Sequence, residues 1–195
     1  SNLTVSGGYY LGQGGGIRVK NSSPRIYNVT ISGNYASNWG GGISLDGSRS
    51  YLSNVTIIAN ASDVAGGGIN ITACDPILNN VVISGNSAQY WAGGFHGYAT
   101  NAIFNNVIIA HNSVTDVGGH GGGVVLDSDS NPIFNHVTIT ENTAEFGGEI
   151  HIKTYFSTSI TMLNSIIWNN TSESICVHWS CENLNELEID LLFTY

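Results

Sequence analysis

The sequence predicts an all-β fold, a single parallel β-helix of about seven coils, each about 26 residues long with three short strands. Three observations predict it. An asparagine recurs at a fixed interval, a glycine triplet recurs in phase with it, and apolar and polar residues alternate between these markers with a period of two. Because so short a repeat cannot bury an apolar face alone, stacked repeats must share one continuous core.

The first marker is an asparagine that returns every 26 residues from the start of the chain. Its copies are Asn2, Asn28, Asn54, Asn80 and Asn106, then His136 and Asn164 after longer steps. A second series in the same phase comprises Asn34, Asn60, Asn86, Asn112, Asn142 and Asn170. Asparagine tolerates the left-handed backbone, and stacked amides can pair with the copies above and below. We therefore expect both series to form internal ladders at corners.

The strands of each coil follow from the alternation after each glycine triplet. In the first complete coil, residues 14–16 are glycines, which permit a tight corner, and residues 17–20 alternate as the first strand. A short second strand is expected at Ile26, and a third at residues 29–32. Prolines mark one further corner. The extra residues around 117–120 are expected to fall between strands.

Composition and charge exclude some partners. With 195 residues, of which 42% are hydrophobic, the chain can form one domain with a sizeable core. Five Lys and Arg against 14 Asp and Glu give a formal net charge of −9, which argues against nucleic acids and anionic membranes as partners. The sequence holds no apolar run of about 18 residues, so no transmembrane segment is expected.

The glycine triplets followed by Ile, together with the run Asn-Val-Thr-Ile-Ser-Gly-Asn at residues 28–34, resemble the right-handed β-helix repeats of microbial and algal surface proteins. These repeats are related in style to polymorphic outer-membrane repeats and to pectate-lyase-like folds. Residues 164–170 and 188–193 resemble the segments that close such arrays, although Leu191 replaces a proline. The resemblance implies a right-handed coil, an extracellular or cell-surface location, and an adhesive or structural role.

Two parts of the chain are expected. Residues 1–171 form the β-helix repeats, and residues 172–195 form a degenerate final coil or C-terminal cap. Because the chain starts in the middle of a repeat, we expect it to be a fragment of a longer chain.

The function expected from these features is that of a non-enzymatic structural or adhesive module, such as a glycosylated subunit of a surface appendage or filament. Its expected partners are further copies, other surface proteins or carbohydrate. The alternative is a polysaccharide lyase, a hydrolase or a carbohydrate-binding module of the pectate-lyase-like type. Were it an enzyme, the candidate groups would be Asp127, Asp129, His96, His120 and His151. Asp127 and Lys153, on adjacent coils, are instead expected to form a surface ion pair.

No catalytic residue, cofactor or metal is assigned, and two metal alternatives stay open. Asp127 and Asp129 have the spacing that opens a Ca²⁺ loop, but Pro132 stands at its glycine position and Thr138 at its closing glutamate. A polar corner with an Asx-turn is the other interpretation of that run. A zinc site that uses His120 is the second alternative.

Two tryptophans, Trp39 and Trp91, occupy equivalent corners just before a glycine triplet, two coils apart. Their rings could contact a saccharide, because aromatic faces stack on sugar rings, or they could simply cover the core.

Covalent modifications are predicted at asparagine acceptors and cysteines. Asn21, Asn70, Asn169 and Asn170 lie in Asn-x-Ser/Thr sequences and are the expected glycosylation positions, whereas Asn28 and Asn54 are expected to be stacked inside. Cys176 and Cys181 are five residues apart and are expected to form a disulfide, which leaves Cys74 as a free thiol or a link to another segment.

A flat, uncharged strip is predicted on the outer face of the third strand. Its residues are Thr30, Thr56, Val82, Ile108 and Thr138. Three explanations stay open: an ordinary β surface, a contact face for another copy or domain, and a lattice match to ice or crystalline glycan.

Overall fold

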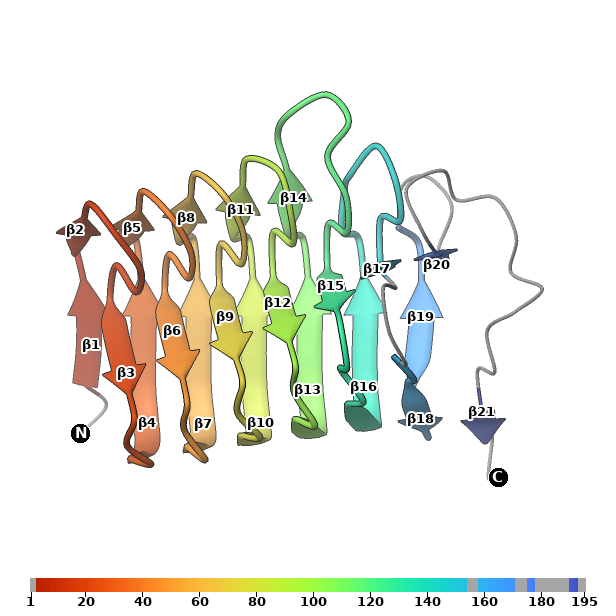
Figure 1. The fold of residues 1–195 in the computed structure, drawn as a ribbon, viewed down its shortest axis with the longest axis horizontal. Helices are drawn as coiled ribbons and strands as arrows, with labels where there is room; N and C mark the ends of the chain where they lie inside the picture. Colours follow the sequence, from red (N-terminus) through yellow and green to blue (C-terminus); the bar gives the residue numbers. More distant parts are fainter. Residues whose placement is uncertain (1–2, 154–157, 171–174, 178–189, 193–195) are drawn as a thin grey trace.

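The computed structural model describes residues 3–153, 158–170, 175–177 and 190–192 of the chain. It is an all-β rod in which every paired strand runs parallel to its neighbour in the next coil, as predicted (Figure 1). The strands of the described residues make about six turns, about 26 residues apart. In the described part of the chain there is no helix, and so none that could cross a membrane.

Three sheets run along the rod. Sheet A contains β1 (Leu3–Ser6), β4 (Arg25–Ser32), β7 (Tyr51–Ile58), β10 (Ile77–Ser84), β13 (Ile103–Ala110), β16 (Ile133–Thr140), β18 (Thr161–Leu163), β19 (Ile166–Trp168) and β21 (Asp190–Leu192). Sheet B contains β2 (Tyr9–Tyr10), β5 (Tyr35–Ala36), β8 (Ala61–Ser62), β11 (Ser87–Ala88) and β14 (Ser113–Val114). Sheet C contains β3 (Ile17–Lys20), β6 (Ile43–Asp46), β9 (Ile69–Thr72), β12 (Phe95–Tyr98), β15 (Val124–Asp127), β17 (Ile150–Lys153) and β20 (Ile175–Val177).

Each coil contains three strands, as predicted, but the bounds of the second and third strands differ from the prediction. The two segments expected at Ile26 and at residues 29–32 are one eight-residue strand, β4. Asn28 adopts a φ of 54° and bends this strand without ending it. Asn54 has the same conformation in the next coil, so β4 and β7 stay paired on both sides of the bend. The third strand of the coil is instead the two-residue β5. The extra residues around 117–120 lie between β14 and β15, in the green loop that rises highest in Figure 1, as predicted.

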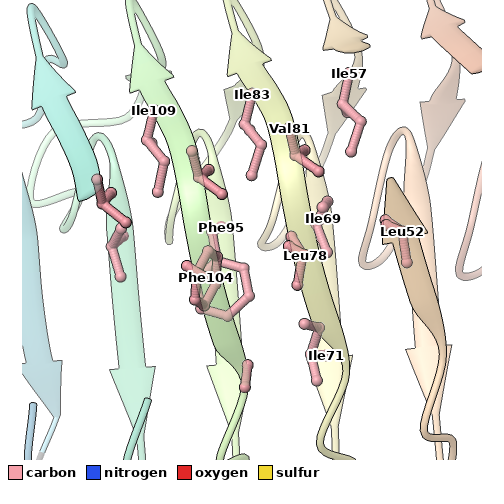
Figure 2. Close-up of a cluster of buried hydrophobic side chains, with 14 of the residues drawn as sticks. Leu52, Ile57, Ile69, Ile71, Leu78, Val81, Ile83, Phe95, Phe104 and Ile109 are labelled. Atoms are coloured by element: carbon pink, nitrogen blue, oxygen red, sulfur yellow. The ribbon is translucent and has the colours of Figure 1, made fainter. Parts of the chain in front are cut away.

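The core lies between the three sheets and repeats coil by coil. In sheet A the register places Ile57 between Ile31 and Ile83, and all three are fully buried. Figure 2 shows such files of aliphatic side chains beside the rings of Phe95 and Phe104. These two rings meet edge to face with 4.9 Å between their centroids. Like residues therefore stack at each level of the core.

The second asparagine series forms the predicted internal ladder. Asn34, Asn60, Asn86, Asn112 and Asn142 are all at most 2% exposed. In each coil the backbone N–H and the Nδ2 group donate to the Oδ1 atom of the next asparagine, as from Asn60 to Asn86 at 3.0 Å. The same Nδ2 group also donates to a strand carbonyl, that of Ile31 for Asn60. Each rung thus closes one corner and joins two coils.

The first asparagine series also stacks, but the prediction that it lies inside is wrong. Nδ2 of Asn54 donates to Oδ1 of Asn28 at 3.1 Å, and the same contact links Asn80 to Asn54 and Asn106 to Asn80. All four side chains are exposed, because the left-handed bend turns them outward from sheet A. Asn28 and Asn54 are therefore accessible acceptor asparagines.

Candidate functional site

Corner residues cover the outer face of sheet C. Just before each glycine triplet, one residue pairs by a parallel bridge with its equivalent in the next coil. These residues form the corner column: Trp39, Ala65, Trp91, His120 and Phe146. The glycine triplets let the chain beside this column pack closely against sheet B, because a Cβ on Gly67 would lie 2.1 Å from the carbonyl oxygen of Ser87 on β11.

Aromatic rings of the corner column stack along the rod. The ring centroids of Trp91 and His120 are 4.8 Å apart with nearly parallel planes, and those of His120 and Phe146 are 5.0 Å apart. On β17, the ring of His151 lies 4.4 Å from that of His120 and 6.1 Å from that of Trp91. Trp91 is therefore held against the outer face of sheet C.

Sheet C supplies polar groups beside these rings. Oδ1 of Asn70 on β9 lies 2.8 Å from Nδ1 of His96 on β12, and Nδ2 of Asn70 donates to the Thr72 hydroxyl at 3.3 Å. Burial lowers the pKa of His96 to about 4, so its ring is neutral at neutral pH. Nδ1–H of the neutral ring donates to Asn70 and leaves Nε2 as a hydrogen-bond acceptor.

An ion pair lies at the C-terminal side of these groups. Nζ of Lys153 is 3.5 Å from Oδ2 of Asp127, and the two side chains are only 20% and 15% exposed. The same ammonium lies 4.2 Å from the centroid of the Trp91 ring, within cation–π range. The predicted pair exists, but most of it is shielded from solvent.

Together these side chains surround a groove of about 380 Å³. Ligand pockets in proteins usually measure about 300–1,000 Å³. The residues that line the groove are Trp39, Val64, Ala65, Asn70, Thr72, Trp91, His96, Tyr98, Asp127 and Lys153. The structure thus combines Trp39 and Trp91 with hydrogen-bonding groups from four strands of sheet C, β9, β12, β15 and β17.

The five candidate catalytic residues do not meet as an acid–base set. His96 and Asp127 line the groove, while His120 and His151 are buried beside Trp91. Asp129 is exposed at a corner with a φ of 56°. Asp127 already accepts hydrogen bonds from the N–H and the hydroxyl of Ser128. In the described ranges, no three His, Cys, Asp or Glu side chains are grouped as metal ligands would be.

Four outward side chains of sheet C are covered and not exposed to solvent. Ser44, Asn70, Val125 and His151 point outward from the core, yet each is at most 1% exposed. The corner column covers these side chains. Alternation of apolar and polar residues shows which side chains point away from the core, but it does not show that a neighbouring corner lies over them. Asn70 is therefore not the accessible acceptor that was predicted.

The other modification candidates lie in different surroundings. Asn21 and Asn169 are exposed, whereas Nδ2 of Asn170 donates to the carbonyls of Ile139 and Trp168. Cys74 is a buried free thiol, and burial raises its pKa. Cys176 is disulfide-bonded. Its predicted partner Cys181, like most of residues 172–195, lies outside the described residues.

Comparison with known proteins supports the fold. A family model described as a right-handed β-helix region matches residues 15–188. The chain belongs to this right-handed β-helix family. No curated protein sequence and no solved structure matches it significantly. Membership in the β-helix family agrees with the handedness that the resemblance implies. Function must be argued from the groove, because one fold supports many functions.

Proposed function

We propose that this β-helix is a non-enzymatic adhesive module that binds a saccharide in the groove on sheet C. The observation that carries the proposal is the placement of Trp39 and Trp91 beside Thr72, His96 and Tyr98 in one groove. Indole faces pack against the C–H groups of a sugar ring, while nearby hydroxyl and imidazole groups bind its hydroxyls. An extracellular or cell-surface location suits this role.

The proposal includes no cleavage step. Glycoside hydrolysis by a carboxylate pair needs two carboxyl groups about 5–9.5 Å apart. Of the residues that line the groove, Asp127 alone carries a carboxylate, and it is paired with Lys153. This arrangement favours binding over turnover.

Replacement of Trp91 by Ala should weaken saccharide binding by about thirtyfold or more, since a tryptophan at the centre of a binding site typically supplies about 2 kcal/mol or more. Calorimetry with a panel of neutral cello-, xylo-, manno- and chito-oligosaccharides measures this. The matched control is Trp168→Ala, because Trp168 is 71% exposed on sheet A, away from the groove. Equal affinities of Trp91→Ala and wild type, or no binding of any sugar by wild type, would contradict the proposal.

A second candidate function is self-association through the outer face of sheet A. The exposed fractions of Ile58, Ile108 and Ile166 there are 39%, 44% and 61%. Outward side chains from β7 to β16 include no Lys, Arg, Asp or Glu, although the chain carries a net charge of −9. Two such copies repel least through an uncharged face. The four eight-residue strands β7, β10, β13 and β16, each about 26 Å long and about 4.8 Å apart, offer on the order of 500 Å² per copy, the size of a weak or transient interface.

The substitution Ile108→Glu should abolish this self-association, because it places unpaired carboxylates in a face-to-face contact. Light scattering over a concentration series should show wild type forming dimers and Ile108→Glu remaining monomeric. Val117→Glu adds the same charge on a loop residue that is 90% exposed and should behave as wild type. A wild-type protein that stays monomeric throughout the series would refute this second candidate.

A further inference from the structure

The groove on sheet C is electrically balanced. Of its lining residues, Lys153 is the one Lys or Arg and Asp127 the one Asp or Glu, and their charged atoms are 3.5 Å apart. A carboxylate that entered the groove would meet Asp127 as well as Lys153. Because like charges repel strongly in a partly desolvated site, Asp127 opposes any anionic ligand.

Lys153 is also positioned by a second contact that does not depend on a ligand. Its ammonium lies 4.2 Å from the centroid of the Trp91 ring, and only 20% of the side chain is exposed. A ligand carboxylate would therefore have to replace Asp127 as the partner of Lys153. The nearby His96 adds no positive charge at neutral pH, because burial lowers its pKa to about 4.

We infer that the groove selects neutral saccharides and rejects uronates, and that Asp127 is the residue that determines this selectivity. The inference rests on the saccharide-binding function proposed above and specifies the substrate class. The polar contacts left to a neutral sugar are those of Thr72, His96 and Tyr98. These groups bind hydroxyls and require no net charge.

The test is a gain of function. Asp127→Asn removes the competing carboxylate and keeps an oxygen that can accept from Ser128, so the local fold should persist. Calorimetry with oligogalacturonate should show weak or no binding by wild type and an increase of about tenfold or more in Asp127→Asn, the size expected when a charge-assisted contact is gained. Affinity for the neutral sugar should change little. The gain should fall with added salt and vanish in the double variant Asp127→Asn/Lys153→Gln.

A matched control is present in the chain. Asp46 forms the equivalent pair with Lys20, at 3.9 Å, on β3 and β6 outside the groove. Asp46→Asn causes the same change in net charge and should leave oligogalacturonate binding at the wild-type level. Equal gains in both variants would show a general charge effect and overturn the inference.

Failure of the inference is distinguishable from failure of the proposed function. A wild type that binds oligogalacturonate at least as tightly as neutral sugars would refute the selectivity while leaving saccharide binding intact. The same holds if Asp127→Asn, shown by circular dichroism to be folded, gains no affinity. A wild type that binds neither class of sugar would refute both.

Discussion

Replacement of Asn86 by Ala should destabilise the protein by about 3–5 kcal/mol, a large part of the stability of a typical domain. Asn86 is fully buried in the internal ladder. Its Oδ1 accepts from both the backbone N–H and Nδ2 of Asn60, and its Nδ2 donates to the Ile57 carbonyl and to Oδ1 of Asn112, all at 3.0 Å. Alanine leaves these buried groups without partners, and each such group costs about 1–3 kcal/mol.

The control for this variant lies on the exposed ladder of the same coil. Asn80→Gly keeps the left-handed backbone, which has a φ of 53°, and removes contacts of the same type with Asn54 and Asn106. Because water can replace the lost contacts, this variant should lose only about 1 kcal/mol. Urea unfolding of both variants measures the difference. Similar losses in the two would mean that burial of the ladder is not what stabilises the corners.

Replacement of Gly67 by Ala should cost about 3 kcal/mol or more, because the added methyl has no space. Its Cβ would lie 2.1 Å from the Ser87 carbonyl oxygen and 2.7 Å from that of Gly93. Both atoms belong to the backbone, so neither can rotate away. Thermal unfolding should show the loss as a large fall in Tm.

A matched substitution separates lack of space from backbone strain. Gly85 has a φ of 63°, but the nearest atom to its added Cβ would be 4.0 Å away. Ala59 already occupies the equivalent corner one coil earlier with a φ of 54°. Gly85→Ala should therefore cost only about 1–2 kcal/mol, the penalty of the left-handed conformation. A larger loss in Gly85→Ala than in Gly67→Ala would contradict the packing argument.

The repeat made the rod and its register predictable, because a recurring sequence places like residues one coil apart. The side on which each asparagine lies was harder to predict. Asn34 and Asn28 have the same spacing, and only backbone geometry separates the buried ladder from the exposed one. Both can stack, so the pattern alone does not decide between inside and outside.

The groove was predicted only in part. The sequence placed Trp39 and Trp91 at equivalent corners and Asp127 beside Lys153, but it did not bring the two sets together. They meet because the corner column lies against the outer face of sheet C, a contact between two segments of the coil that the alternation within a strand does not indicate. The sequence offered Asn70 as a glycosylation acceptor and His96 as a candidate catalytic group, and only the structure brings them together, with 2.8 Å between Oδ1 of Asn70 and Nδ1 of His96.

The measurement that tests the saccharide-binding groove most directly is the response of the tryptophan indole N–H signals in NMR spectra to added neutral oligosaccharide. We expect the Trp39 and Trp91 signals to shift together and to saturate, while that of Trp168, on sheet A, stays in place. Unchanged Trp39 and Trp91 signals across the whole panel, or a shift confined to Trp168, would contradict the account.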